Sequence, residues 1–405
     1  MKSIRFISIL TALVFFMSAF SSCESSAPKG SSTSKTDLSP SPSESPSIES
    51  ESLKDSPSQG TSLAPSPSPS NALSEDEQYL ASVSYRHYEL TGEDTPYFMG
   101  RWFKTKVNGE FHMVTTNSGS MLYFMVKGAT SMEVNFTHHS GEHVAFYAYS
   151  IDGKTPVRKN INDPTVPLPD EGRHTVRIIT EGVHEHVGKW SNEKGYAFKN
   201  VVPSEGGEIL GIKPTEKIIF FYGDSITEGI NAIGATGYGE SHSATNAYPW
   251  YCSEKLGTVL YNIGYGATGL INTGSFNTMI NAIDRMANKR YVTTDITPDV
   301  IVINHGHNDQ YYSSDAMEAA LKKTITHLKE KYPEVTIVYM IPFNQAHAKT
   351  ITEYMAGVEN SYVVTTKGWS ISMTEGVHPN KAGAKYAGER LAEELLTIFG
   401  EEYFD

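Results

Sequence analysis

The stretch KIIFFYGDSITEG, residues 217–229, is an apolar run that stops at a glycine, a carboxylate and a serine. An apolar run without polar alternation is typical of a parallel strand that is buried on both faces. Ligands of parallel α/β sheets bind beyond the carboxyl ends of the strands, and Ser225 falls there. The stretch alone leaves two interpretations open, because Ser225 can be a helix N-cap or a nucleophile.

Strands and helix-length segments alternate after this stretch. Asp315 and Glu318 resemble a capping box for a helix that ends at Pro333, and a last helix is predicted from about 381 to 399. Further strands are predicted at 259–263, 300–303, 335–341 and 362–364. This alternation predicts an α/β fold with a doubly wound, flavodoxin-like parallel sheet.

The region before residue 214 has a different pattern, without helical periodicity of useful length. Asp152-Gly153 is a hairpin signal. Short apolar or alternating runs bounded by turn residues lie at 121–126, 132–136, 144–151 and 174–179. They predict an all-β, jelly-roll-like antiparallel sandwich. Trp102 and Trp190 are interpreted as packing residues, and the sequence His-Glu-His at 184–186 as a solvated loop, with a ligand-binding surface as the alternative.

The N-terminal residues 1–23 have the charged start and short apolar middle of an export signal. The apolar run is too short to be a confident membrane span. Residues 19–23, AFSSC, resemble the lipobox of bacterial lipoproteins, in which the cysteine carries the lipid, although Phe20 departs from the usual aliphatic residue. We expect an exported protein that is anchored to the membrane only through lipid on Cys23. Cleavage near Ala19, giving a secreted protein, is the alternative.

Serine and proline dominate the segment that follows the export signal, which has few apolar side chains to bury and is predicted to be a disordered tether. The sequence thus divides into four predicted parts. These are a signal with lipobox at 1–23, a Ser/Pro-rich linker at 24–80, a β-sandwich domain at 81–213 and an α/β domain at 214–405.

Charge and cysteine content exclude some functions. The chain of 405 residues has a formal net charge of -13, whereas nucleic-acid binding relies on a basic face. Its two cysteines, Cys23 and Cys252, fall in an export signal and a folded domain, so no mutual disulfide is expected. Two cysteines also exclude a zinc site built from several thiolates.

Polar residues follow several of the predicted parallel strands. A glycine loop, NIGYGATG, covers 262–269, the sequence NHGHND covers 304–309, and EGVHPN covers 375–380 just before the last helix. A nucleophilic serine needs a base and hydrogen-bond donors for the oxyanion. Because these loops converge on one edge of a parallel sheet, the sequence predicts that the serine, glycine, asparagine and histidine meet there.

The blocks GDSITEG, NIGYGATG, GHND and EGVHPN resemble those of the SGNH (GDSL-like) hydrolases, over roughly residues 217–399. The resemblance implies that Ser225 is the nucleophile and that His378 is the base. It also implies that the oxyanion is held by the Ser225 amide, the Gly266 amide and the Asn308 side chain. Gly264 is an alternative to Gly266, since the loop aligns either way. No cofactor and no metal are implied.

The chain departs from this family in the last block, where Glu375 stands three residues before the histidine in place of the usual aspartate. Glu375 can orient the imidazole, or a backbone carbonyl can do so instead. A β-sandwich followed by an SGNH domain is similar to the layout of family-two carbohydrate esterases. Those enzymes remove acetyl groups from plant polysaccharides, some with a Ser-His pair alone.

Aromatic residues near the predicted active edge suit sugar rings, and we expect Trp369, Trp250 and Tyr311 to bind substrate, with core packing as the alternative. The leading expectation is a serine esterase that removes acetyl groups from a glycan. Alternatives are an esterase of small non-carbohydrate esters and an inactive surface glycan-binding protein. A metal-dependent hydrolase that uses His305, His307 and Asp309 is a further alternative.

Overall fold

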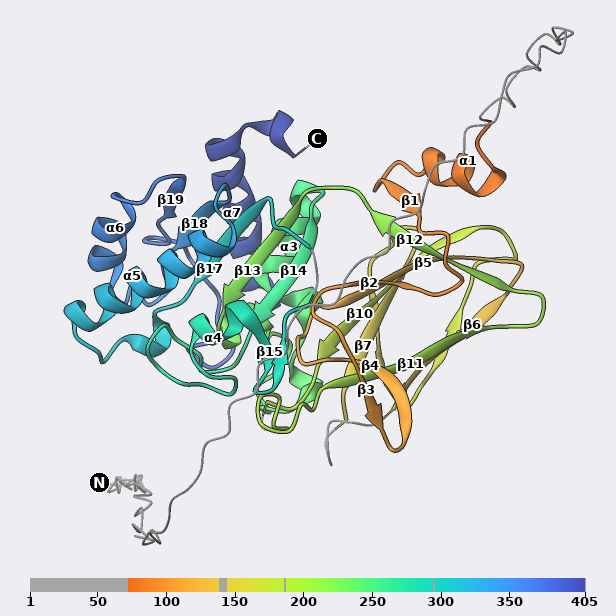
Figure 1. Cartoon of the computed structure of the whole chain (residues 1–405), viewed down its shortest axis with the longest axis horizontal. Helices are drawn as coiled ribbons and strands as arrows, with labels where there is room; N and C mark the ends of the chain where they lie inside the picture. The colour runs from red at the N-terminus through yellow and green to blue at the C-terminus, as the bar shows by residue number, and fades with distance from the viewer. Residues whose placement is uncertain (1–71, 138–143, 186, 294–295, 405) are drawn as a thin grey trace, which may run out of the picture. The chain divides into compact units, whose positions relative to one another are not determined.

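The computed structural model describes residues 72–404 except 138–143, 186 and 294–295 (Figure 1). The predicted export signal, its Cys23 and the linker up to residue 71 lie outside the described residues. Residues Pro69–Asp405 group into one compact unit. In the part of the chain that the structure describes, no helix is both long and apolar enough to span a bilayer.

Two antiparallel sheets form the N-terminal half, which confirms the predicted β-sandwich. One sheet has the order β1-β12-β5-β10-β7-β8, with β2 also paired to β5, and the other has the order β3-β4-β11-β6-β9. Apolar side chains from both sheets share one core. The strands are β1 Tyr88–Leu90, β2 Tyr97–Met99, β3 Phe103–Val107, β4 Glu110–Thr115, β5 Met121–Lys127, β6 Ser131–Thr137, β7 Phe146–Ile151, β8 Val157–Asn160, β9 Thr165–Pro167, β10 His174–Gly182, β11 Tyr196–Pro203 and β12 Glu208–Pro214.

The C-terminal half contains the predicted parallel sheet, in the order β14-β13-β17-β18-β19. This order makes β13 the switch point, because the chain leaves it first to β14 on one side and later to β17 on the other. The elements are β13 Ile218–Gly223, α2 Ser225–Glu228, α3 Tyr248–Leu256, β14 Val259–Gly264, α4 Met279–Asp284, β15 Arg285–Ala287, β16 Arg290–Tyr291, β17 Val300–Asn304, α5 Ser314–Lys331, β18 Thr336–Met340, α6 Ala348–Met355, β19 Ser361–Val364 and α7 Lys381–Phe399.

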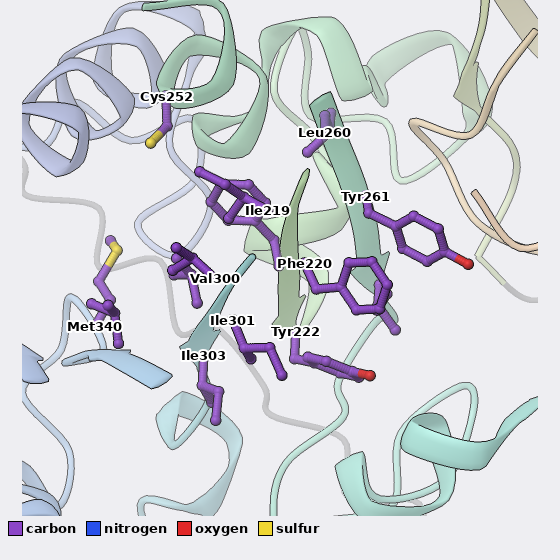
Figure 2. Close-up of a cluster of buried hydrophobic side chains, with 14 of the residues drawn as sticks. Ile219, Phe220, Tyr222, Cys252, Leu260, Tyr261, Val300, Ile301, Ile303 and Met340 are labelled. Atoms are coloured by element: carbon purple, nitrogen blue, oxygen red, sulfur yellow. The ribbon is translucent and has the colours of Figure 1, made fainter. Parts of the chain in front are cut away.

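The core of this half is built on the apolar run of β13 (Figure 2). Ile219 and Phe220 point to opposite faces of β13, and both are buried. Phe220 stacks on Tyr261 of the neighbouring strand, with ring centroids 4.0 Å apart. Cys252 on α3 is a free, buried cysteine, and burial raises the pKa of its thiol. A strand buried on both faces holds its carboxyl end rigidly, and that end carries the site.

Two helix starts differ from the sequence predictions. The N-cap of α5 is Ser313, whose hydroxyl accepts a hydrogen bond from the Ala316 amide at 3.2 Å, so the predicted capping box that begins at Asp315 is wrong and the helix begins earlier. Helix α1, Glu75–Ser82, covers the end of the predicted linker, which was placed at 24–80. It forms there because Ser74 and Glu77 make a reciprocal capping box and Leu80 packs into the core.

The two halves share a core. Sheet residues Met121, Tyr123 and Ile179 pack in the same apolar cluster as Ile219 of β13. All nine residues of β10 are buried, because one face of this strand meets the sandwich core and the other meets the α/β half. The β-sandwich therefore supports the α/β sheet directly.

Candidate active site

Ser225 is the first residue of α2, directly after β13. The N-cap is Asp224, whose carboxylate accepts a hydrogen bond from the Ile226 amide at 2.9 Å. Asp224 thus fills the capping role, which leaves the Ser225 hydroxyl available for another partner. Gly223 permits this turn, since a methyl group added to it would lie 1.9 Å from the Thr227 hydroxyl oxygen.

His378 is the partner of that hydroxyl. The distance from Ser225 Oγ to His378 Nε2 is 2.8 Å, although the two residues are 153 positions apart in sequence. The other ring nitrogen, Nδ1, is hydrogen-bonded to Oε1 of Glu375. With the proton on Nδ1, the ring donates to Glu375 and Nε2 accepts from the serine, which is the arrangement that a general base requires. The structure thus brings Ser225, His378 and Glu375 together, and of the two alternatives for orienting the imidazole it places Glu375 on Nδ1.

Asn308 lies in the turn after β17, at the switch point beside β13. Its Nδ2 donates to Asp224 Oδ2 at 3.0 Å and to the Thr268 carbonyl at 3.1 Å. Burial raises the pKa of Asp224 to about 7, and the charge of Asp309 adds to the rise, while the Ile226 amide opposes it. Asn308 therefore ties three active-edge loops together, as the convergence argument predicts.

The glycine loop differs from the expected oxyanion site. The Gly264 amide donates to Asn262 Oδ1 at 3.0 Å, and the Gly266 amide donates to Glu228 Oε2 at 2.9 Å, so both predicted donors already have acceptors. The next residue, Ala267, is exposed and has a φ of 55°. Its amide has no hydrogen-bond partner among the described residues. The sequence gives no signal for Ala267, because left-handed backbone at such a loop is usually marked by glycine.

Gly264 has a steric role in this loop. A methyl group added there would lie 2.4 Å from the Glu228 backbone nitrogen and 2.8 Å from its Cα. Because backbone atoms cannot move aside easily, we expect Gly264→Ala to lower the free energy of unfolding by about 3 kcal/mol. Urea denaturation measures this loss. The control is Gly357→Ala, whose added methyl meets only the Tyr354 carbonyl at 3.6 Å, and an equal loss in both variants would contradict the steric explanation.

A buried ion pair joins the sandwich to the glycine loop. Lys189, in the β10–β11 connection, pairs with Glu228 of α2, and both side chains are almost fully buried. Burial raises the pKa of Glu228, and the Lys189 charge works in the opposite direction. The same carboxylate accepts the Gly266 amide, so the ion pair fixes the loop next to Ser225.

Removing the lysine leaves a buried carboxylate without its counter-charge. We therefore expect Lys189→Met to lower the free energy of unfolding by about 3 kcal/mol at neutral pH. Glu228→Gln in the same chain removes the unpaired charge and is expected to restore part of that loss. Urea denaturation of the single and double variants measures both effects. A double variant less stable than Lys189→Met would contradict the charge explanation.

The sequence His-Glu-His at 184–186 was interpreted as a solvated loop, and the structure shows His184 and Glu185 half-buried. His184 stacks on Tyr238 with ring centroids 5.0 Å apart, and the Glu185 carboxylate occupies the space where a side chain of Gly266 would lie. Trp190 packs edge-on against Phe276 at 4.3 Å. His186 lies outside the described residues. Glu185 of the sandwich therefore lies against the glycine loop of the α/β half, which sequence order alone does not reveal.

The aromatic residues fall into different environments. Trp102 packs in the sandwich core, as interpreted from sequence, and donates from Nε1 to the Met99 carbonyl. Trp250 is 5% exposed with Arg177 over its ring, so its expected substrate role is corrected to core packing. Trp369 is half-buried against Tyr386 and Arg390 of α7. Tyr311 is 92% exposed beside the Asn308 turn.

Two residues of the metal alternative, His305 and Asp309, have other partners. His305 Nδ1 lies 3.2 Å from the Thr268 carbonyl, and burial lowers the pKa of His305 to about 4. Asp309 accepts hydrogen bonds from the amides of residues 270, 271 and 272. Across the described residues, no group of three His, Cys, Asp or Glu side chains is placed to hold a metal ion.

Comparisons with known proteins agree with this geometry. Residues 221–386 match the model of the GDSL-like Lipase/Acylhydrolase family. No curated protein matches the chain in sequence. A family-two carbohydrate esterase from Clostridium thermocellum, solved with cellohexaose, is 20% identical, with a TM-score of 0.62, over 76% of this chain and 99% of that one.

Two further solved structures are similar. An acetyl xylan esterase from the rumen bacterium Butyrivibrio proteoclasticus is 16% identical, with a TM-score of 0.59, over 78% of this chain and 100% of that one. A salicylyl-acyltransferase of a tetracycline biosynthetic pathway is 14% identical, with a TM-score of 0.56, over 77% and 98%. Residues 221–386 therefore match the GDSL-like lipase/acylhydrolase family, in a chain that has the fold of family-two carbohydrate esterases.

Proposed function

We propose that this protein is a serine esterase that removes acetyl groups from a glycan. The observation that carries the proposal is the 2.8 Å contact between Ser225 Oγ and His378 Nε2, with Glu375 on the other ring nitrogen. The glycan substrate is supported by the similar solved structures, of which one is described with cellohexaose and one as an acetyl xylan esterase. The chain itself adds Tyr311, an exposed aromatic side chain close in sequence to Asn308.

The reaction follows from the positions of these groups. His378 Nε2 takes the hydroxyl proton of Ser225 as the oxygen attacks the acetyl carbonyl carbon. The negative oxygen that forms needs donors, and the backbone amides of Ser225 and Ala267 serve, with Asn308 Nδ2 joining once it exchanges a present acceptor for the oxyanion. The C–O bond to the sugar breaks, and the histidine returns its proton to the departing hydroxyl.

Deacylation repeats these steps with water. His378 removes a proton from a water molecule that attacks the acetyl-serine, acetate leaves, and the proton returns to Ser225 Oγ. Glu375 accepts from Nδ1 throughout and favours the charged imidazolium that exists between the two proton transfers. The chain's own side chains and amides supply every group in this sequence.

An acetate-release screen tests the substrate proposal. Acetylated xylan, mannan and pectin are compared with 4-nitrophenyl acetate at equal acetyl concentration, and release from at least one polysaccharide is expected. Hydrolysis of the small ester alone would favour the alternative esterase of non-carbohydrate esters. Binding of a polysaccharide without any acetate release, from either class of substrate, would favour the glycan-binding alternative.

Export and lipid attachment at Cys23 belong to the same proposal and are supported by the sequence of residues 1–23. An extracellular, surface-held esterase would meet polymeric substrates that do not enter a cell. Metabolic labelling with a fatty acid, followed by recovery of the protein, tests the attachment. Label on the natural chain that is absent after Cys23→Ser is the expected result, and an unlabelled natural chain would instead indicate secretion after cleavage near Ala19.

A further inference from the structure

Asn231 lies in the segment between α2 and α3 and joins it to the loop that carries the base. Its Nδ2 donates to Glu375 Oε1 at 3.1 Å. Its backbone carbonyl accepts from the Thr374 hydroxyl at 2.8 Å, so two adjacent residues of the base-bearing loop are attached to it. Asn231 is only 9% exposed. One residue that follows the nucleophile in sequence therefore holds the acid that contacts the base.

Asn231 is itself held in one orientation. Its Oδ1 accepts from the Gly237 amide at 3.2 Å and from the Ser241 hydroxyl at 2.9 Å. Since the Gly237 amide can only donate, the side-chain amide cannot flip, and Nδ2 must be the atom that faces Glu375. Its φ of 54° is a left-handed conformation that asparagine tolerates better than most residues.

The contact from Asn231 restrains a side chain that is longer than the usual aspartate. Glu375 has one more rotatable bond than the aspartate that its position resembles, and its side chain is 33% exposed. Holding a longer, partly exposed side chain in one conformation costs more entropy. In the described part of the chain, the Glu375 carboxylate has two side-chain partners, His378 and Asn231, and only Asn231 lies outside its own loop.

We propose that Asn231 is a positioning residue that fixes Glu375 against His378 and thereby makes a glutamate serve where an aspartate is usual. The inference rests on the proposed esterase function, and it assigns to Asn231 no contact with substrate. Removing its donor should leave substrate binding unchanged and lower only the rates of the steps in which the imidazole carries charge.

The electrostatics of the loop agree with this geometry. Burial acts to raise the pKa of Glu375, but the hydrogen bonds from His378 and Asn231 outweigh it and hold that pKa below its usual value. Losing the Asn231 donor should raise the pKa of Glu375, so that the carboxylate is protonated, and activity lost, at a higher pH than in the natural chain. The other titratable groups near the base are His242, whose pKa burial lowers to about 3, and His307, whose pKa burial also lowers.

Asn231→Asp tests the proposal, because it keeps the shape and the Oδ1 acceptor but replaces the donor with a carboxylate oxygen, which repels the Glu375 carboxylate instead of binding it. With 4-nitrophenyl acetate, kcat is expected to fall about tenfold with KM changed less than twofold. The acid side of the kcat profile is expected to move to higher pH. Asn231→Gly, which tolerates the left-handed backbone, should give the same pattern if the aspartate folds poorly. Asn281→Asp, which removes a 3.0 Å amide contact with Thr278 on α4, is the control and should change neither quantity.

A double-variant cycle separates positioning from a structural role. In a Glu375→Ala chain, Asn231→Asp should lower kcat by less than about twofold, because the group it positions is gone. If the kcat losses of Asn231→Asp and Glu375→Ala multiply in the double variant, the proposal is overturned. It is also overturned if Asn231→Asp lowers the melting temperature but keeps the natural kcat and pH profile. The low-field NMR resonance of the His378 Nδ1 proton needs no substrate. It should be lost or shifted in Asn231→Asp, and an unchanged resonance refutes the positioning role even if the chain hydrolyses no ester.

Discussion

Ser225→Ala is expected to lower the hydrolysis of 4-nitrophenyl acetate by at least roughly a thousandfold. The hydroxyl that contacts His378 at 2.8 Å is the group that forms the acyl bond, and no other described side chain donates to that imidazole nitrogen. Initial rates and burst-phase acetylation measure the effect. The fold should be unchanged, since Asp224 caps α2 and the Ser225 side chain does not.

Ser253→Ala is the matched control. Ser253 is a buried helical serine of α3 whose hydroxyl has no partner in the described structure, so its loss should leave the rate and the stability nearly unchanged. A chelator should also leave the rate unchanged, since the proposed steps use only side chains and amides. Substantial turnover in Ser225→Ala would remove the esterase assignment.

His378→Ala is expected to lower kcat about as much as Ser225→Ala. Glu375→Ala is expected to have a smaller effect, so that its kcat stays about a hundredfold above that of His378→Ala. The reason is that the base moves protons in both half-reactions, while the acid only orients the ring and stabilises its charge. Full kcat and KM values for the two variants on one small ester measure the difference.

Equal losses in Glu375→Ala and His378→Ala would show that the acid is as essential as the base. Glu375→Gln gives a second comparison. It keeps the length of the side chain and an oxygen that can accept from Asn231, and it removes the negative charge. An unchanged kcat in both Glu375 variants would indicate that the Glu375–His378 contact has no catalytic role.

The fold was predictable because each decisive signal is local. The apolar run of β13 marks a strand buried on both faces, and the alternation that follows it marks a parallel sheet. The meeting of Ser225, Asn308 and His378 follows from topology, since loops after parallel strands share an edge. The order of strands and loops in the sequence was therefore sufficient to predict which of these residues meet.

The remaining features depend on contacts that the chain order does not encode. Whether the Gly266 amide is free depends on Glu228, and the position of Glu228 depends on Lys189 from the other half of the chain. Trp250 was assigned to the substrate from its place near an active-edge loop, but the packing of β10 against α3 buries it. Asn231 gave no signal, because its role arises from a loop without regular secondary structure.

The ion pair between Lys189 and Glu228 makes the α/β half depend on the sandwich. A fragment beginning at residue 214 would retain every group of the proposed reaction, yet it would carry an uncompensated anion beneath the loop that faces the nucleophile. The sandwich is thus not a detachable accessory, and recombination that exchanges it for another module must also replace either the lysine or the glutamate.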